Sequence, residues 1–255
     1  MIDGLAIFRT HFADFAGNYM LIGGAACDIQ LERVGVPFRV TRDLDIVLCV
    51  EALSPEFGRA FWDFVNAGAY QKREKSGGGK QFYRFSRPAT PGYPVMLELF
   101  SRQPDFAISP ESGLTPIPLD DEVSSLSAIL LDDGYYDFIR EHRVEIGGLP
   151  LLAMEALIVL KAKAWLDLSD RRARGEAVDA RNIKTHKNDI CRLFAALPEI
   201  ARVRLPSAIE PEIRLFLNRL ADSELDPRSL GLPLSREVIL NGLGELFELP
   251  GQQKK

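Results

Sequence analysis

The sequence predicts a protein of the mixed α/β (α+β) class, with a mixed β-sheet core, flanking helices and a C-terminal helical region. Short apolar runs of strand length alternate with helical periodicities over residues 1–149. From residue 150 onward the apolar positions recur only at helical spacing, between Pro and Gly breaks. We therefore expect an α/β core over 1–149, a helical region over 150–250 and a flexible tail over 251–255.

The composition is that of a globular protein and excludes a disordered, a collagen-like or a disulfide-stapled chain. The chain has 255 residues, of which 46% are hydrophobic and 26% are charged. Its cysteines, Cys27, Cys49 and Cys191, are too far apart to predict a disulfide framework or a cysteine zinc site. The first residues lack a signal-peptide pattern, and charged residues interrupt the most apolar segment, 149–168. We expect a cytoplasmic protein with no membrane role.

The first 50 residues predict two helices and two buried strands. Apolar positions at helical spacing favour a helix over 3–16, and the run YMLIG favours a strand over 19–23. The segment after Gly24 has small and apolar residues at helical spacing, so a helix is expected over 25–34. The continuous β-prone run that ends in LCV predicts a strand over 44–50.

The next segment predicts a helix, a hairpin and a further strand. Ser54 is a typical N-cap, and the apolar periodicity after it predicts a helix over 55–69. The glycines of SGGGK predict a hairpin whose arms are 71–75 and 81–87. The run VMLELF predicts a strand over 95–100. Residues 103–128 are rich in proline, and we expect a loop that covers a sheet edge or forms a lid.

The remainder predicts one more strand and then helices alone. HRVEIGG favours a strand over 142–148. Thr185 is a candidate N-cap for the helix that carries the sequence KTHKNDICRLFAAL. The helices expected in this part lie at 151–168, 185–197, 208–222 and 235–247.

Three carboxylates fall on two of the predicted strands. Alternate side chains of a strand share a face, so Asp43 and Asp45 point the same way. Two carboxylates this close are unfavourable unless they are neutralised, and a divalent cation with oxygen ligands is a natural partner. Glu98 would add a third carboxylate if its strand lies beside that of Asp45. Such a set is able to hold metal ions for phosphoryl transfer.

Other interpretations of these residues remain open. One aspartate of the pair could cap the loop while the other binds an arginine such as Arg39 or Arg42, and Glu98 could lie on an exposed strand face. Gly23 and Gly24 allow close approach of the backbone, whose N–H groups at the helix start are able to bind a polyphosphate. The alternative for these glycines is a simple tight turn.

The net charge of −5 is unevenly distributed along the chain. From Lys161 to Arg192 there are nine Lys or Arg residues and five acids, so this segment is +4 and the rest is −9. Such a run forms either a solvated pair of helices or a surface that binds phosphate groups. Lys161 lies on an otherwise apolar helical stripe, so its ammonium group must reach solvent or meet an anion.

With these residues in place, the chain resembles the nucleotidyltransferase superfamily, whose pattern is an apolar strand, two small residues, a helix and Asp-x-Asp in a second strand. Within it the chain is similar to the AbiEii-like branch, the toxins of abortive-infection (type IV) toxin–antitoxin systems. Three stretches carry the resemblance and cover most of residues 19–195. They are LIGGAACDIQ with RVTRDLDIVL, GLPLLAMEALIVLKAKAW, and KTHKNDICRL.

The resemblance implies transfer of a nucleoside monophosphate from an NTP to an acceptor hydroxyl, with Mg²⁺ or Mn²⁺ as cofactor. The implied metal ligands are Asp43, Asp45 and, in support, Glu98, and Asp189 is the implied base for the hydroxyl. The implied nucleotide-binding residues are Gly23, Gly24, Thr41, Lys161 and Lys187. The implied acceptor is an RNA such as tRNA, and a cognate antitoxin is the implied partner. The alternatives are a small-molecule acceptor, as in antibiotic nucleotidyltransferases, or a catalytically silent module that binds nucleotide or a partner protein.

Overall fold

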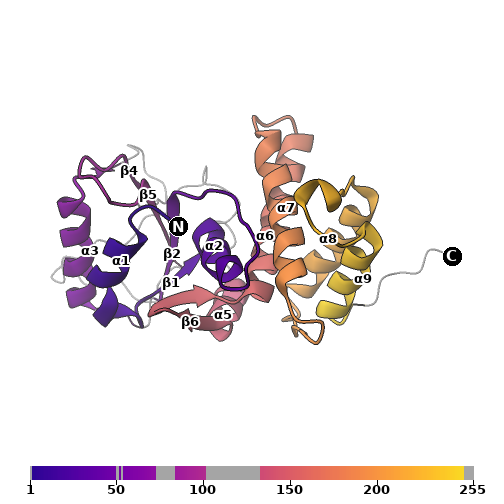
Figure 1. Cartoon of the computed structure of the whole chain (residues 1–255), viewed down its shortest axis with the longest axis horizontal. Helices are drawn as coiled ribbons and strands as arrows, with labels where there is room; N and C mark the ends of the chain where they lie inside the picture. Colours follow the sequence, from indigo (N-terminus) through magenta and orange to yellow (C-terminus); the bar gives the residue numbers. More distant parts are fainter. Residues whose placement is uncertain (1, 50–51, 53, 73–83, 102–132, 250–255) are drawn as a thin grey trace.

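A mixed β-sheet forms one half of the molecule and a group of helices forms the other (Figure 1). The structure is a computed structural model that describes residues 2–49, 52, 54–72, 84–101 and 133–249. Within these ranges seven strands form a single sheet. Their order across the sheet is β3 (Gln71–Lys72), β4 (Arg84–Ser86), β5 (Met96–Phe100), β2 (Asp43–Leu48), β1 (Tyr19–Ile22), β7 (Leu149–Leu152) and β6 (Arg143–Ile146). The predicted fold class is confirmed.

The centre of the sheet is apolar on both faces except where the acidic residues lie. All four residues of β1 are buried, as expected for a continuous apolar run covered on both sides. In β2 the pattern alternates at the start of the strand, with Leu44 and Ile46 buried and Asp43 and Asp45 partly buried. Strand β2 is antiparallel to β1 and parallel to β5. The carboxylates of β2 therefore project from one face at one end of the central strands.

Helices cover the sheet and continue beyond it. The helices of the first half are α1 (Leu5–His11), the 3-10 turn η1 (Ala13–Phe15), α2 (Gly23–Arg33), α3 (Pro55–Ala67) and α5 (Asp133–Glu141). The second half contains α6 (Met154–Ala173), α7 (Ala180–Ala196), α8 (Glu210–Asp222), the 3-10 turn η4 (Arg228–Leu230) and α9 (Arg236–Leu246). Helices α6 and α7 pack along each other, and α2 packs against both (Figure 1). The sheet half and the helical half thus meet at α2, α6 and α7.

Most of the predicted elements are present with small shifts of their ends. The expected strands at 19–23, 44–50 and 95–100 correspond to β1, β2 and β5. Ser54 is the N-cap of α3, and its hydroxyl accepts a hydrogen bond of 3.2 Å from the Phe57 amide, as predicted. The opening helix is shorter than expected, because α1 ends at His11 and a 3-10 turn follows.

The strand β7 corrects the prediction that a helix begins at residue 151. Gly147 and Gly148 have φ values of +59° and +78°, which make the tight turn of a hairpin between β6 and β7. Residues 149–152 are buried at all four positions, so the run has no periodicity that separates a strand from a helix. The sheet therefore extends to Leu152, beyond the 1–149 expected for the core. Helix α5 was not predicted.

The start of α7 also differs from the prediction. The helix begins at Ala180 and not after Thr185, because Asp179 is the N-cap and accepts a hydrogen bond of 2.8 Å from the Arg181 amide. The first turn carries mostly exposed polar side chains. The first turn of α7 therefore has no apolar stripe that could have predicted it from the sequence.

Three other expectations fall wholly or partly outside the described residues. Strands β3 and β4 pair antiparallel, as expected for the arms of the hairpin at 71–75 and 81–87, but residues 73–83 lie outside the described part. The expected loop over 103–128 and the tail over 251–255 lie outside it as well. The described helices include none whose length and hydrophobicity would let it span a bilayer.

Candidate functional site

The structure brings the three predicted acids together on neighbouring strands. Asp45 in β2 lies directly opposite Glu98 in the parallel strand β5, and Asp43 is two residues away on the same face. Burial, and next the charge of Glu98, raise the pKa of Asp45 from 3.8 to about 7. Burial also raises the pKa values of Asp43 and Glu98. The site therefore concentrates negative charge in a place where that charge is poorly solvated.

Arg84 is a partner that the sequence analysis missed. It lies opposite Glu98 in the antiparallel pair β4–β5, and its guanidinium is 2.5 Å from the Glu98 carboxylate. The signal was present, since Arg84 lies in the predicted hairpin, but the register of that hairpin against β5 is not readable from sequence. Glu98 is thus neutralised by Arg84, whereas Asp43 and Asp45 are the more available carboxylates.

The turn between β1 and α2 fits closely against Asp45. Gly23 has a φ of +64°, and a Cβ at this position would overlap the Asp45 carboxylate. The Gly24 amide donates a hydrogen bond to Asp45. A Cβ on Gly24 would lie 2.6 Å from Thr41 Oγ1. Gly23, Gly24, Thr41 and Asp45 therefore form one cluster at the N-terminus of α2, where backbone N–H groups favour an anion.

Lys161 meets an anion inside the protein. Its Nζ is 2.9 Å from Asp189 Oδ2, and the two side chains are 4% and 0% exposed. Arg39 also contacts Asp189, with its Nε 3.4 Å from Oδ1 and its Nη2 3.3 Å from Oδ2. Burial alone would lower the pKa of Lys161, but Cys27 and Asp189 together outweigh this effect and the pKa is raised. The charge of Lys161 also acts on Asp45, so this ion cluster adjoins the acidic site.

This arrangement does not favour the expected role of Asp189 as a base. Burial would raise the pKa of the Asp189 carboxyl, but Lys161 and Arg39 outweigh it and lower the pKa. A carboxylate held by two cations is a weaker proton acceptor. Asp189 therefore acts better as the anchor of Lys161 and Arg39.

Two neighbouring groups were not recognised as parts of this cluster. His186 lies one turn before Asp189, and its Nδ1 is buried without a hydrogen-bond partner in the described part of the chain. Burial, and next the charge of Lys161, lower the pKa of His186 to about 3, so the ring is neutral. Cys27 of α2 is also buried near Lys161 and Asp189, and burial raises the pKa of its thiol to about 12.

Lys187 is directed elsewhere. Its ammonium group donates to the backbone carbonyl of Glu224, in the segment between α8 and η4. Burial lowers the pKa of Lys187. Of the predicted nucleotide-binding residues, the structure thus groups Gly23, Gly24 and Thr41 with Asp45 but turns Lys187 toward the C-terminal helices.

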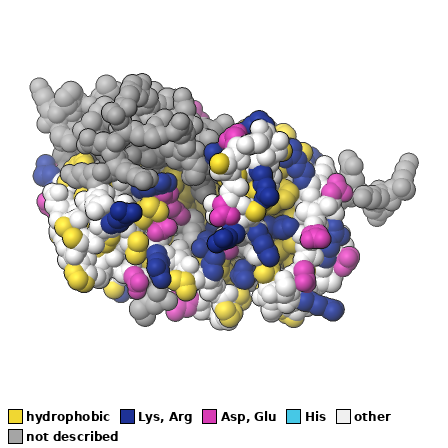
Figure 2. Space-filling model, turned by 90° about the horizontal axis from the view of Figure 1, so that it is seen from above, with side chains coloured by type: hydrophobic (Ala, Val, Ile, Leu, Met, Phe, Trp, Pro, Cys, Tyr) yellow, Lys and Arg dark blue, Asp and Glu magenta, His cyan; other side chains and the backbone are white. Residues whose placement is uncertain are grey.

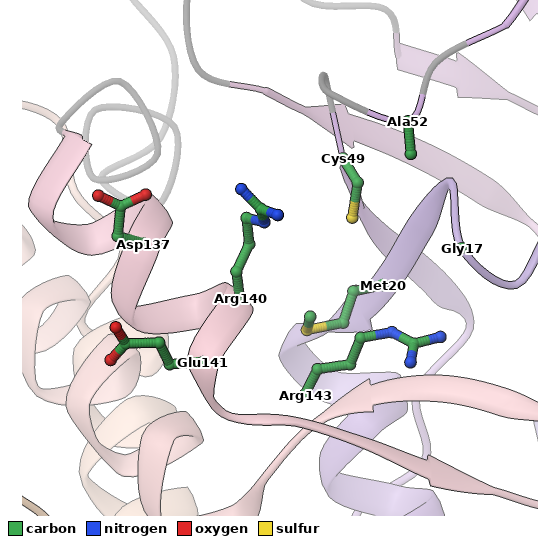
Figure 3. Close-up of a pocket in the computed structure, with 8 residues that line it drawn as sticks. All are labelled: Gly17, Met20, Cys49, Ala52, Asp137, Arg140, Glu141 and Arg143. Carbon is green, nitrogen blue, oxygen red and sulfur yellow. The ribbon is translucent and has the colours of Figure 1, made fainter.

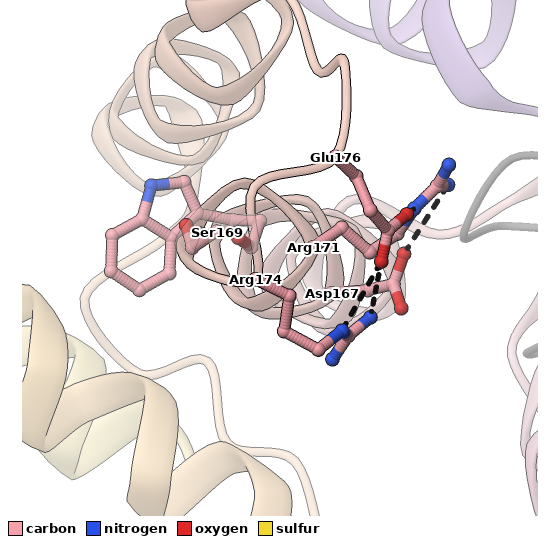
Figure 4. A network of polar contacts seen from close by, with 6 residues as sticks. Asp167, Ser169, Arg171, Arg174 and Glu176 are labelled. Atoms are coloured by element: carbon pink, nitrogen blue, oxygen red, sulfur yellow. Dashed lines mark hydrogen bonds and ion pairs between the residues drawn. The ribbon is translucent and has the colours of Figure 1, made fainter.

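Part of the basic segment is paired within itself (Figure 4). Arg171 and Arg174 bind Glu176 at 2.7 and 2.9 Å, and Arg171 is 4.0 Å from Asp167. These side chains fit the interpretation of the segment as solvated helix ends. Lys and Arg side chains nevertheless gather on the helical half in the face shown in Figure 2. Arg172 of α6 and Arg181 and Lys184 of α7 are exposed, and none of them forms an ion pair with another described residue.

A pocket of about 500 Å³ lies away from the predicted site (Figure 3). Its lining includes Met20, Cys49, Asp137, Arg140 and Arg143. Met20 lies near the beginning of β1 and Cys49 just after the end of β2, whereas Asp45 pairs with Ile22 at the other end of these strands. Asp137 and Arg140 belong to α5, and Arg143 begins β6. None of the predicted site residues lines this pocket, so we treat it as separate from the site.

The donor atoms of the acidic site fit a hard divalent cation. Asp43 and Asp45 offer carboxylate oxygens alone, the ligands that Mg²⁺ and Mn²⁺ prefer. The raised pKa of Asp45 means that a nearby cation would relieve an unfavourable charge. In the described part of the chain, no group of three or more His, Cys, Asp and Glu side chains is arranged as a complete metal site. Asp43 and Asp45 are therefore the ligands that the protein offers, with Glu98 held by Arg84.

Comparisons with known proteins add little at this point. No protein-family model matches the chain, and no curated protein matches it. Among solved structures the chain is similar to the solution structure of the antibiotic-resistance factor ANT(2'')-Ia. The TM-score is 0.37 and the sequence identity 14%, over 86% of this chain and 95% of that chain. At this level of similarity, the function has to be inferred from the site itself.

Replacement of Gly23 by alanine is expected to be far more harmful than a matched change elsewhere. Both Gly23 and Gly175 have a positive φ, but a Cβ on Gly175 would meet nothing within 4 Å. Gly175→Ala should cost roughly 1–2 kcal/mol of unfolding free energy. Gly23→Ala should cost about 1–3 kcal/mol more, because Asp45 must move. Urea denaturation of both variants tests this, and equal losses would contradict the close contact with Asp45.

The charge of Asp45 should make the stability of the protein depend on pH in a defined window. Because the folded-state pKa is about 7 and the unfolded value about 3.9, ionisation of Asp45 destabilises the folded protein as pH rises between these values. His186 has the opposite effect. Because its folded-state pKa is lowered, it makes the folded protein more stable as pH rises from about 3 to 6.5. The informative quantity is therefore the difference in unfolding free energy between the wild type and Asp45→Asn at each pH.

We expect Asp45→Asn, in the presence of a metal chelator, to gain stability relative to the wild type between pH 4 and 7, by about 1–3 kcal/mol in total. The measurement is urea denaturation at several pH values in that window. A difference between the two proteins that does not change with pH would show that the Asp45 carboxyl is not strained by its surroundings.

Proposed function

We propose that the protein transfers a nucleoside monophosphate from an NTP to an acceptor hydroxyl. The observation that carries this proposal is the contact of the Gly23–Gly24 turn with Asp45. It places the N–H groups at the start of a helix, which favour phosphate, beside carboxylates that favour a divalent cation. A nucleotide with bound Mg²⁺ needs both kinds of group within one site.

The reaction has a simple balance. The acceptor oxygen attacks the α-phosphorus, the bond from that phosphorus to the bridging oxygen breaks, pyrophosphate leaves, and the hydroxyl proton passes to solvent. Mg²⁺ or Mn²⁺ bound by Asp43 and Asp45 would neutralise charge on the phosphates. The Gly23–Gly24 backbone and Thr41 would hold phosphate oxygens. Lys161, fixed by Asp189, keeps a positive charge beside this site.

We propose an RNA acceptor in preference to a small molecule. The exposed side chains of Arg172, Arg181 and Lys184 on α6 and α7 support this choice, because unpaired surface cations attract a polyanion. The resemblance to the AbiEii-like branch adds tRNA as the expected RNA, a role as a toxin and a cognate antitoxin as partner. These finer roles, like a cytoplasmic location, stay predictions.

Nucleotide transfer should depend on the two aspartates. Purified protein with Mg²⁺, total RNA and each of four α-labelled NTPs should label RNA. Asp43→Asn and Asp45→Asn should lower the rate roughly a hundredfold or more, because the charge that holds the metal is lost. Asp137→Asn, which changes an exposed acid of the distant pocket, should leave the rate unchanged.

Two results would contradict parts of this proposal. Label in a small metabolite, and none in RNA, would establish transfer but replace the acceptor. No label anywhere, with NTP binding that survives loss of both aspartates, would favour a catalytically silent binding module.

RNA binding should depend on salt through the exposed cations. In a plot of the logarithm of affinity against that of salt concentration, each phosphate contact with a single strand contributes about −0.7 to the slope. The triple change Arg172→Ala, Arg181→Ala and Lys184→Ala should therefore make the slope shallower by about 2.

The matched control changes three exposed arginines outside this surface, Arg9, Arg33 and Arg204, to alanine. It should leave the slope nearly as in the wild type. Filter binding or fluorescence anisotropy with total tRNA, over a range of salt concentrations, provides the measurement. Equal slopes for the two triple variants would argue against an RNA surface on α6 and α7.

A further inference from the structure

Arg39 belongs to an extended segment that crosses the N-terminus of α2. A Cβ on Gly24 would lie 2.6 Å from Thr41 Oγ1 and 3.3 Å from Arg39 Nη2, so both side chains cover this glycine. Val40 between them is 81% exposed, as expected when alternate side chains of an extended segment face opposite ways. Arg39 and Thr41 therefore face the turn in which the phosphates would bind.

One edge of the Arg39 guanidinium is occupied by the helical half. Its Nε and Nη2 contact the two oxygens of Asp189 at 3.4 and 3.3 Å, in a side-by-side arrangement that suits a carboxylate. These are long bonds for a charge-assisted pair. They leave the guanidinium able to shift toward a second anion without losing the first.

The other edge of the guanidinium is available. The Arg39 side chain is 39% exposed. Its Nη1 has no hydrogen-bond partner among the described residues. The guanidinium carbon lies 5.1 Å from the centre of the Phe38 ring, which supports the side chain from behind. An anion at the N-terminus of α2 would thus find a supported guanidinium with free N–H groups.

We propose that Arg39 binds a phosphate group of the NTP while it keeps its contact with Asp189. Arg39 then links the phosphate-binding turn of the sheet half to α7 of the helical half. The inference rests on the proposed nucleotidyl transfer, and it adds a residue for which the sequence analysis offered only a structural pairing with an aspartate. An arginine suits this double role, because its planar fork serves two anions at once, whereas the compact ammonium of a lysine does not.

The test compares Arg39→Lys and Arg39→Ala with Arg42→Ala. Arg42 is exposed in the same segment, and its charge also acts on Asp43, but it makes no contact with Asp189. Arg39→Lys keeps a positive charge beside the buried Asp189, so it is the variant expected to fold with an unfolding midpoint close to that of the wild type. Thermal melting establishes this before binding is measured.

The probes are ATP, CTP, GTP and UTP, each with Mg²⁺, and inorganic triphosphate with Mg²⁺, measured by titration calorimetry. We expect the dissociation constant of the preferred NTP to rise about tenfold in Arg39→Lys and further in Arg39→Ala, which is the loss of one charge-assisted contact. The affinity for inorganic triphosphate should fall by a similar factor, since it offers phosphates without base or ribose. Arg42→Ala should change either affinity less than about twofold, because an exposed charge that touches no ligand is screened.

The outcomes separate this inference from the proposed function. If the wild type binds no NTP, both are overturned. If the wild type binds an NTP and folded Arg39→Lys binds it equally well, or no more weakly than Arg42→Ala does, Arg39 does not contact phosphate and the proposed function stands. If Arg39→Lys loses affinity for the NTP but keeps that for inorganic triphosphate, the phosphate contact is overturned as well.

Discussion

The buried ion pair between Lys161 and Asp189, together with Arg39, is the interaction on which the arrangement of the two halves depends. The pair is 2.9 Å apart and almost inaccessible to solvent. Either charge alone would cost several kcal/mol in such a place, so each side chain requires the other. Because Lys161 lies on α6 and Asp189 on α7, the pair fixes the register of these helices. Arg39 extends the pair to the segment that enters β2. The same few charges therefore hold the helical half against the acidic edge of the sheet.

The acidic site is the opposite case, because three carboxylates lie close together and, among the described residues, only Glu98 forms an ion pair, with Arg84. Asp45 and Glu98 face each other across parallel strands, and Asp43 is on the same face. The Gly24 amide and the nearby Lys161 relieve Asp45 in part, yet its pKa remains near 7. A protein that needed only stability would gain by replacing such a group with an uncharged one. The unrelieved charge is thus better explained by a cationic ligand than by the fold.

The positions of the acids and glycines in the fold could be predicted because the information for them is local. Asp43 and Asp45 share a face through the two-residue period of a strand, and Gly23–Gly24 follow an apolar run. The sequence predicted β7 and the start of α7 poorly, for different physical reasons. A run of four buried apolar residues has no period, and the first turn of α7 is set by the Asp179 cap and carries no apolar stripe. The pairing of Arg84 with Glu98 was missed because it depends on strand register, and that of Arg39 with Asp189 was missed because the two residues are 150 positions apart in the sequence.

The basic segment shows why a charge count along a sequence overestimates a charged surface. Its nine Lys and Arg side chains make different contacts in the structure. Lys161 is buried against Asp189, Lys187 binds a backbone carbonyl, and Arg171 and Arg174 share Glu176. A polyanion would therefore meet a smaller set, centred on Arg172, Arg181 and Lys184. Lys161, inside the protein, acts on the acidic site instead. The segment thus places cations both inside the protein and on its surface, a difference that its net charge of +4 does not show.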